Sequence, residues 1–339
     1  MQELLLLDHG SGGRASHRLI NEVFVSRFSN PVLNLLDDAA RLEMSGPISM
    51  STDSYTVDPL FFPGGDIGSL AVHGTVNDVA MLGAEPQFIS CAFIIEEGFA
   101  LDALCRIADS MAMAARLAGV RIVTGDTKVV PRGAADKVFI NTTGIGCILA
   151  DPIPGGCGAR PGDAVLISGP VGDHGLAVMS SRAGLALAPD VKSDSAPVHE
   201  MILNLLRAKI PLHVLRDPTR GGLATTLNEI AGQSQVVLEL EQSCIPIRPG
   251  VAQAASVLGL DPLYLACEGR VIVFTAKEQA EAALKIMRAS PHGEMACHIG
   301  TVLEPREETG RPGQVILKTS IGGKRLLAML EGEQLPRIC

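Results

Sequence analysis

The sequence predicts an α/β protein of the α+β type, with two domains and a flexible C-terminal tail. Its 339 residues suggest two domains, and a hydrophobic content of 47% is typical of a well-buried globular chain. Strand-like and helix-like segments alternate in both halves, which a Pro- and Gly-rich linker separates at 150–163. We therefore place the N-terminal domain at 1–150, the C-terminal domain at 151–330 and a mobile tail at 331–339.

The first half contains both kinds of element. Alternation of apolar and polar residues indicates strands, and apolar stripes with the helical period indicate helices. Asp66 is the expected N-cap of the first helix, and Gly119 closes the second. The expected strands span 32–36, 40–45, 47–57, 85–95, 120–130 and 137–149, and the expected helices span 66–84 and 101–119.

The second half repeats this alternation after the linker. The last nine residues are polar, contain Pro336 and lack a core-forming pattern, which predicts a tail. The expected strands span 164–169, 236–240, 269–276, 298–303 and 313–319, and the expected helices span 175–184, 198–209, 221–233, 251–259 and 278–290.

Composition excludes several classes of protein. The 28 basic and 37 acidic residues give a net charge of −9, which disfavours nucleic-acid binding. No apolar run is long enough to cross a membrane, and the start of the chain lacks the basic region of a signal peptide. We therefore expect a cytoplasmic protein with no membrane partner.

The eight cysteines follow no metal-binding spacing. The nearest approach is His292, Cys297 and His298, and this set does not favour a metal site. In a reducing compartment we expect most of the thiols to be small core residues. Cys339 is the exception, because a chain terminus is seldom part of a core.

No P-loop is present, because the one Gly-Lys pair, at 323–324, is followed by Arg325. The stretch GPVGDHG at 169–175 lies between an expected strand and an expected helix. Its spacing departs from the dinucleotide-binding pattern, so an ordinary turn is favoured. Its backbone N–H groups could still bind an anion.

Acidic residues indicate a functional site more clearly than the glycine-rich stretch does. Carboxylates at the ends of elements can converge on Mg²⁺, which prefers oxygen ligands and shares them with phosphates and water. For any one of these residues alone, a role in a turn or cap is favoured. Asp78 stands out, because it lies with His73 and Asn77 in an otherwise apolar helix. The full set is Asp37, Asp38, Asp53, Asp78, Asp126 and Asp217.

Several motifs occur together in this chain, and together they resemble the HypE family of hydrogenase maturation proteins. That family belongs to the superfamily of aminoimidazole ribonucleotide synthetase, selenophosphate synthetase and thiamine-phosphate kinase. The resemblance covers essentially the whole chain, and a terminal cysteine after Pro-Arg-Ile is specific to the HypE family. The motifs are HGSGGR (9–14), DDAA (37–40), the block at 51–86, TGDTKVV (124–130), RDPTRGGLA (216–224), CEGR (267–270) and PRIC (336–339).

The resemblance implies an ATP-dependent carbamoyl dehydratase. In this family the terminal cysteine receives a carbamoyl group from the carbamoyltransferase HypF, and ATP-driven loss of water leaves a thiocyanate. The cyano group then passes through the HypC–HypD complex to the iron of a [NiFe] hydrogenase. The resemblance also implies two domains of the aminoimidazole ribonucleotide synthetase-like fold, a homodimer formed through the ATP-binding N-terminal domains, and Mg²⁺ beside ATP.

The same resemblance assigns roles to residues. It makes Cys339 the carrier of the reacting group, Glu268 the base and Lys128 the cation near the phosphates. From the residues alone, Lys128 could be an exposed strand-end lysine and Glu268 could pair with Arg270. The implied metal ligands are Asp38, Asp78 and Asp217, and the implied nucleotide-binding residues are Asp38, Asp53, His73, Asn77, Asp126 and Thr127.

Three other functions compete with this one. Selenophosphate synthetases carry a reactive Cys or selenocysteine in an N-terminal Gly-rich segment, and HGSGGR contains none. A thiamine-phosphate kinase would fit the ATP motifs but leaves Cys339 without a task. A non-enzymatic protein whose tail docks a partner would differ from both in having no ATP turnover.

Overall fold

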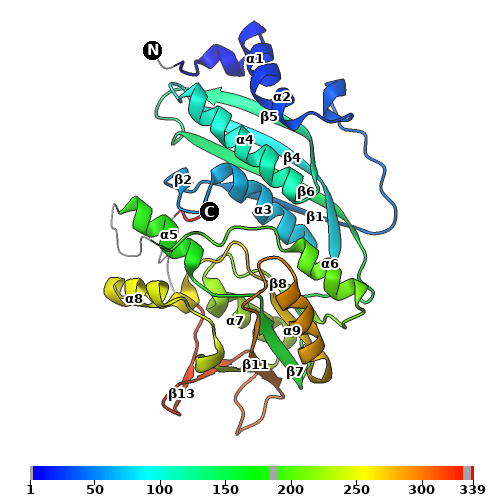
Figure 1. The fold of residues 1–339 in the computed structure, drawn as a ribbon, viewed down its shortest axis with the longest axis vertical. Helices are drawn as coiled ribbons and strands as arrows, with labels where there is room; N and C mark the ends of the chain where they lie inside the picture. Colours follow the sequence, from blue (N-terminus) through cyan, green and yellow to red (C-terminus); the bar gives the residue numbers. More distant parts are fainter. Residues whose placement is uncertain (1–2, 184–189, 331–336) are drawn as a thin grey trace.

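The computed structural model describes residues 3–183, 190–330 and 337–339 and shows two α/β domains stacked along the long axis (Figure 1). The predicted two-domain fold is confirmed. Most of the predicted tail, 331–336, lies outside the described residues. The last three residues lie between the two domains and not on the outer surface (Figure 1).

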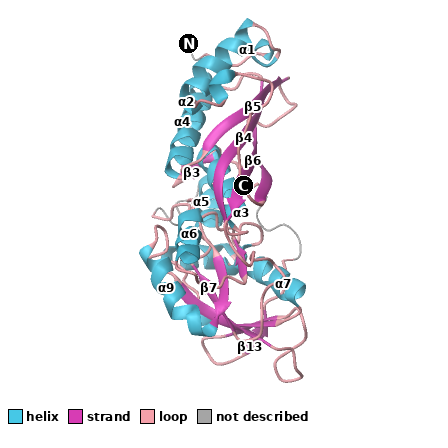
Figure 2. Cartoon of the chain, turned by 90° about the vertical axis from the view of Figure 1, so that its right-hand side faces the viewer, coloured by secondary structure: helices cyan, strands magenta, loops and turns pink. Residues whose placement is uncertain are grey.

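A four-stranded sheet forms the centre of the N-terminal domain, in the order β1-β6-β4-β5. Strands β4 and β5 are parallel because helix α4 connects them, and the other neighbours are antiparallel. Helices α3 and α4 cover one face of this sheet (Figure 2). These elements are β1 (Ile48–Tyr55), α3 (Ile67–Ala80), β4 (Ala84–Glu96), α4 (Leu101–Leu117), β5 (Arg121–Val130) and β6 (Val138–Ile148), with the short hairpin β2 (Phe61–Phe62) and β3 (Gly65–Asp66) before α3.

Helix α3 is buried on almost every side, because it lies between the sheet and the C-terminal domain. The side chain of Asp66 accepts hydrogen bonds from the N–H groups of Gly68 and Ser69, so the predicted N-cap is confirmed. Gly68 lets α3 approach α4 closely, since an added Cβ would lie 2.5 Å from the Ile107 carbonyl oxygen.

The C-terminal domain contains a seven-stranded sheet in the order β13-β12-β9-β11-β7-β10-β8. All five residues of β7 are buried, because separate apolar clusters cover the two faces of the sheet. The strands are β7 (Asp163–Ile167), β8 (Val214–Arg216), β9 (Val237–Glu241), β10 (Ile272–Ala276), β11 (Cys297–Leu303), β12 (Val315–Lys318) and β13 (Lys324–Leu326). The helices are α5 (Asp173–Arg182), α6 (His199–Arg207), α7 (Gly222–Ser234), α8 (Pro249–Leu258) and α9 (Ala280–Ala289).

The structure corrects the prediction near the N-terminus. Residues 14–28 form a continuous helical segment that the sequence analysis did not predict: α1 (Arg14–Leu19), a π-helical stretch (Ile20–Val25) and α2 (Ser26–Phe28). The strands predicted at 32–36 and 40–45 are wrong. The first is a 3-10 turn at Leu33–Leu35, and the second has no pairing partner, so apolar residues there do not form a ladder.

The expectation that most thiols lie in the core is partly confirmed. Cys91, Cys147 and Cys267 are buried, whereas Cys157 and Cys244 are exposed. The remaining three cysteines, including Cys339, are partly buried. No helix among the described residues has both the length and the apolar character that a membrane span requires.

Candidate active site

The last three residues pair with the segment that follows strand β1. The N–H of Thr56 donates to the carbonyl oxygen of Cys339 (3.1 Å), and the N–H of Asp58 donates to that of Arg337 (3.3 Å). In both bonds segment 56–58 supplies the N–H group and the terminus supplies the carbonyl oxygen. The side chain between them, Ile338, is 5% exposed and belongs to the core of the N-terminal domain. The end of the chain is therefore a structural element.

Helix α5 of the C-terminal domain holds the same three residues from the other side. Nε2 of His174, near the start of the helix, donates to the carbonyl oxygen of Ile338 (2.9 Å). Arg182, at its end, donates to the carbonyl oxygens of Arg337 (2.6 Å) and Asp58 (2.7 Å). Both domains thus contribute to the place where Cys339 lies.

The sulfur of Cys339 lies close to acidic groups. Burial raises the pKa of this thiol to about 12, and the negative charges of Glu268 and Asp53 add to the effect, while Arg220 opposes it. A thiol in this position stays protonated and is a poor nucleophile.

Asp53, Asp78 and Asp217 lie close together, with Asp78 in the middle, and Asp53 lies near the thiol of Cys339. Burial and the repulsion between the neighbouring carboxylates raise the pKa of Asp53 and of Asp78 to about 6. The hydroxyl of Ser51 donates to Asp78 (2.7 Å), and Arg220 forms an ion pair with Asp53 (3.2 Å).

Glu268 is the most buried acid of the site, at 2% exposure. Burial and the charges of the surrounding aspartates raise its pKa well above the ordinary value. Its Oε1 atom is buried without a hydrogen-bond partner, which is a costly arrangement in a structural residue. The alternative that Glu268 pairs with Arg270 is not seen, because Arg270 lies between Asp173 and Asp194. These properties suit a group that gains and loses a proton during a reaction.

The carboxylates fit a divalent cation only as part of a shared ligand set. In the described part of the chain, no group of three or more Cys, His, Asp or Glu side chains could hold a metal by itself. Asp217 Oδ2 is buried and unpartnered, and hard carboxylate oxygens are the donors that Mg²⁺ prefers. Because Mg²⁺ commonly takes one or two carboxylates and completes its shell with phosphates and water, the set is compatible with it.

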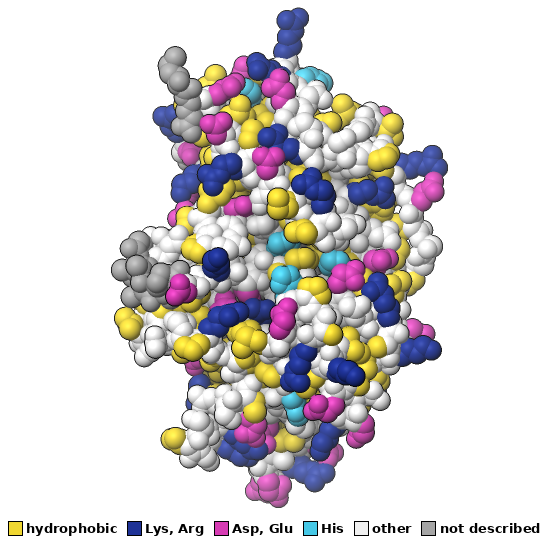
Figure 3. Space-filling view, viewed as in Figure 1, with side chains coloured by type: hydrophobic (Ala, Val, Ile, Leu, Met, Phe, Trp, Pro, Cys, Tyr) yellow, Lys and Arg dark blue, Asp and Glu magenta, His cyan; other side chains and the backbone are white. Residues whose placement is uncertain are grey.

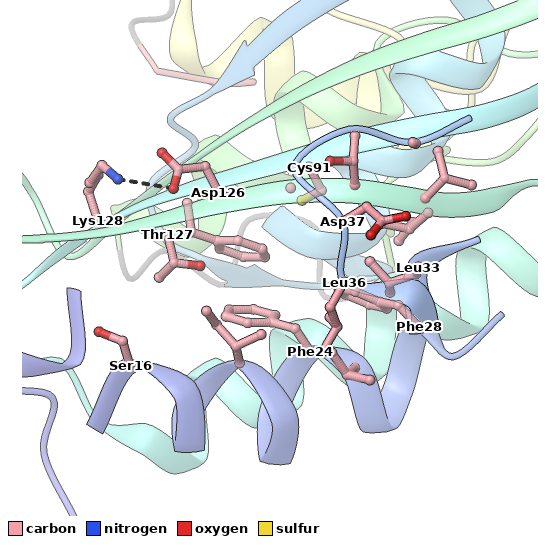
Figure 4. Close-up of a pocket in the computed structure, with 18 of the residues that line it drawn as sticks. Ser16, Phe24, Phe28, Leu33, Leu36, Asp37, Cys91, Asp126, Thr127 and Lys128 are labelled. Carbon is pink, nitrogen blue, oxygen red and sulfur yellow. Dashed lines mark hydrogen bonds and ion pairs between the residues drawn. The ribbon is translucent and has the colours of Figure 1, made fainter. Parts of the chain in front are cut away.

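A second group of the predicted residues surrounds a cavity of about 300 Å³ between strand β5 and the N-terminal helices (Figure 4). Phe24, Phe28 and Leu33 form an apolar wall, and Thr127 projects toward them from the strand (Figure 4). Asp126 and Lys128 project from the other side of β5 and form an ion pair (3.0 Å). Lys128 is exposed, which agrees with the interpretation of this residue as an exposed lysine at the end of a strand.

Asp38, His73 and Asn77 are not brought into either group. Asp38 borders a neighbouring hollow over the outer face of the sheet. The Asn77 side chain crosses between the domains, donating to the Ala196 carbonyl (2.9 Å) and accepting from the Val198 N–H (2.8 Å). Nδ1 of His73 pairs with the Ser195 hydroxyl (3.1 Å), and burial lowers its pKa to about 4.

Further histidines lie near His73, and their positive charges add to the effect of burial in lowering the pKa of His73. Figure 3 shows histidine side chains gathered across the middle of this face of the molecule. The nucleotide-binding roles given to His73, Asn77 and Asp38 stay predictions, as do the roles of the other site residues.

The sequence analysis missed the residues that hold the terminus. His174 lies inside GPVGDHG, which we interpreted only as a turn or an anion site, and Arg182 ends the following helix. Arg220 was within a quoted motif but received no role. Asp173 and His174 are adjacent polar residues at the start of helix α5, and both are buried. This pair of polar residues was the sequence feature that could have pointed to a functional role.

Comparison with known families matches both halves of the chain. The AIR synthase related protein N-terminal domain matches residues 36–148, and the corresponding C-terminal domain matches residues 160–312. A thiamine-monophosphate kinase from Stenotrophomonas maltophilia shares the fold, with a TM-score of 0.67 at 18% identity over 94% of this chain and 99% of that one. Fold and site thus define a two-domain AIR synthase related protein.

Closer relatives are carbamoyl dehydratases called HypE. The Cupriavidus necator protein is 51% identical over 98% of this chain and 94% of its own length, and the Escherichia coli K12 protein is 44% identical over 98% of each. A hydrogenase maturation protein HypE crystallised in complex with ATP has a TM-score of 0.96 and 63% identity, covering 99% of this chain and all of that one. The chain belongs to the HypE family.

The raised pKa of Glu268 predicts how stability depends on pH. The folded protein retains a proton that the unfolded chain releases above the ordinary pKa of 4.5, so stability is lost as pH rises. Glu268→Gln removes this loss and should gain about 1 kcal/mol or more in unfolding free energy over wild type between about pH 5 and pH 8.

Urea unfolding in metal-free buffer at both pH values measures this gain. Glu278→Gln, at an exposed position, is the matched control and should show no pH-dependent difference. An equal difference between Glu268→Gln and wild type at both pH values would contradict the raised pKa.

Proposed function

We propose that this protein uses ATP to dehydrate a carbamoyl group carried on the sulfur of Cys339, leaving a thiocyanate that supplies the cyanide ligand of a [NiFe] hydrogenase. The observation that carries the proposal is the docked terminus, which places this sulfur beside the buried, unpartnered Glu268. Membership of a family whose members are called carbamoyl dehydratases supports it.

The docked state explains why loading occurs elsewhere. With a pKa of about 12 the seated thiol is unreactive, so Cys339 acquires its carbamoyl group with the terminus undocked, in a partner's active site. A relative crystallised as a HypE–HypF complex supports a HypF-type carbamoyltransferase as that partner. We further propose the HypC–HypD complex as cyanide acceptor, and the cytoplasm as the place where these proteins meet.

Within the site the chain's own groups have separate tasks. Bound ATP would supply the phosphoryl group that makes the carbamoyl oxygen a leaving group. In its ionised form Glu268 would accept a proton from the carbamoyl nitrogen, and its raised pKa makes that carboxylate a stronger base than an ordinary glutamate. Arg220, near both Asp53 and the sulfur, offers a cation to charge that develops on oxygen.

We propose that the nucleotide occupies the cavity beside β5. Its apolar wall suits a purine base, and Lys128 offers a cation for phosphate oxygens at the end of the strand. A relative crystallised with ATP supports nucleotide binding in this family. Asp78 and Asp217, with Asp53 next to them, would hold Mg²⁺, which would neutralise phosphate charge.

We also propose a homodimer formed through the N-terminal sheet. Helices cover one face of this sheet, and the other face is largely open (Figure 2). Ile48, Met50 and Ile94 on that side of the sheet are 52%, 65% and 45% exposed. Apolar side chains gathered on an open face are typical of a subunit interface.

Replacing the carrier or the base should stop the reaction at different stages. Cys339→Ala should take up no carbamoyl group from a HypF-type enzyme and form no thiocyanate. Glu268→Gln should accumulate the carbamoyl form and dehydrate it at least about a hundredfold more slowly, because the base is missing. Intact mass spectrometry distinguishes the two adducts; a thiocyanate on Cys339→Ala would show that the carrier is another residue.

The Mg²⁺ assignment predicts a defect in ATP turnover. Asp78→Asn should lower Mg²⁺-dependent ATP hydrolysis by about tenfold or more while the circular dichroism spectrum stays unchanged. Asp102→Asn, at an exposed position on α4, is the matched control and should hydrolyse ATP at the wild-type rate. Wild-type turnover in Asp78→Asn would remove this residue from the site.

The dimer proposal predicts a two-chain mass by light scattering at micromolar concentration, because obligate interfaces bury about 2,000 Å² or more. Met50→Glu places a charge on the open face, at its edge strand β1, and should give a monomer. Val257→Glu, at an exposed residue of the C-terminal domain, should leave the mass unchanged. A monomeric wild type would refute the dimer.

A further inference from the structure

Among the described residues, helix α5 forms two hydrogen bonds to the terminus, and both go to main-chain carbonyl oxygens. His174 donates to the carbonyl of Ile338, and Arg182 donates to the carbonyl of Arg337. These two carbonyls belong to consecutive residues, and neither contact involves the sulfur of Cys339. The recognition is therefore independent of what the sulfur carries.

The His174 ring is fixed in one orientation. A carbonyl oxygen can only accept, so Nε2 must bear the hydrogen that Ile338 receives, and Nδ1 then accepts from the hydroxyl of Ser193 (2.8 Å). The edge of Phe62 packs against the ring at 5.5 Å between centroids and 86° between planes. The side chain is fully buried, so no water can replace the Nε2 bond when the terminus is docked.

The same ring connects the terminus to the base. Ser193, which orients His174, is followed by Asp194, whose Oδ1 accepts from the N–H of Glu268 (3.1 Å). The N–H of Ser193 also donates to the Pro63 carbonyl in the other domain (2.8 Å). One short segment thus sets the positions of the histidine that holds the terminus and of the glutamate next to the sulfur.

We infer that His174 and Arg182 form a main-chain clamp that seats the C-terminal segment and so positions the group on Cys339 against Glu268. They are positioning residues, which touch the carrier's backbone and not the reacting atoms. The clamp accepts the thiol, carbamoyl and cyano forms alike, because its contacts end at carbonyl oxygens. This inference rests on the proposed function for the dehydration step only; seating itself can be measured without it.

Seating is measured by the rate at which iodoacetamide alkylates Cys339 in the full chain. A protease that cuts after lysine releases 325–339, in which Cys339 is the single cysteine, so its adduct is quantified separately from the other thiols. The alkylation rate reports the undocked population, since the docked thiol is protonated and partly buried. Dehydration is measured on the same variants after carbamoyl loading.

His174→Phe keeps the ring shape and removes the donor. It should raise the alkylation rate of Cys339 about five- to tenfold and slow dehydration by a similar factor, the effect of losing one buried hydrogen bond. Loading by the carbamoyltransferase should not slow. His174→Gln, whose amide N–H can reach the same carbonyl, should restore both rates to near wild type.

The controls separate a clamp from a general defect. His199→Phe replaces another buried histidine, on α6, and should leave both rates unchanged. Wild-type alkylation in His174→Phe, or equal effects of Phe and Gln at this position, would overturn the clamp. Slower dehydration with unchanged alkylation would overturn it too. Absence of thiocyanate in wild type would refute the proposed function alone, and the alkylation rates would still decide on the clamp.

Discussion

The docking of the last three residues against segment 56–58 is the interaction on which the site depends. Its hydrogen bonds place Ile338 in the core of the N-terminal domain and so direct the next side chain, Cys339, toward the acidic groups. The four acids come from both domains: Asp53 and Asp78 from the first, Asp217 and Glu268 from the second. Without the docked terminus these groups would surround no reacting atom.

Collecting four carboxylates in one buried place opposes folding. Their raised pKa values show that each one costs free energy when it is ionised among the others. A structural cluster would be expected to include enough cations to offset this charge, yet here Arg220 forms the ion pair with Asp53 from an exposed position. The arrangement is understandable if the charge is balanced by cations that arrive with the substrate.

Much of the fold could be predicted from the sequence, because periodic apolar patterns mark helices and strands that pack against a core. Asp66 was predicted as an N-cap, since a side-chain acceptor just before an apolar helix satisfies its first N–H groups. Segments 32–36 and 40–45 failed for the opposite reason: they are apolar but have no strand to pair with, and pairing is not a local property.

The site was only partly predictable. Asp53 and Asp217 could be proposed as acids at the ends of elements, Asp78 as an acid inside an apolar helix, and Glu268 from the family resemblance; the structure brings the four together. Asp126, Thr127 and Lys128 lie apart from them on β5, which is the opposite edge of the sheet from β1, the strand that carries Asp53. No role could be assigned to His174 from the sequence, because its partner is a main-chain carbonyl oxygen at the far end of the chain. Every residue has such a carbonyl, so the sequence does not indicate which one is the partner.

One measurement tests most directly whether the terminus works in the site of its own chain. Cys339→Ala, which keeps Glu268, is co-expressed with Glu268→Gln, which keeps the thiol, and the mixture is loaded with carbamoyl groups and given ATP. Since the terminus pairs with segment 56–58 of its own chain, we expect carbamoyl adducts and no thiocyanate by intact mass, while wild type forms thiocyanate in parallel. Thiocyanate formation in the mixture near the wild-type rate would contradict this account. The carbamoyl group on the cysteine of one chain would then be dehydrated in the site of another chain.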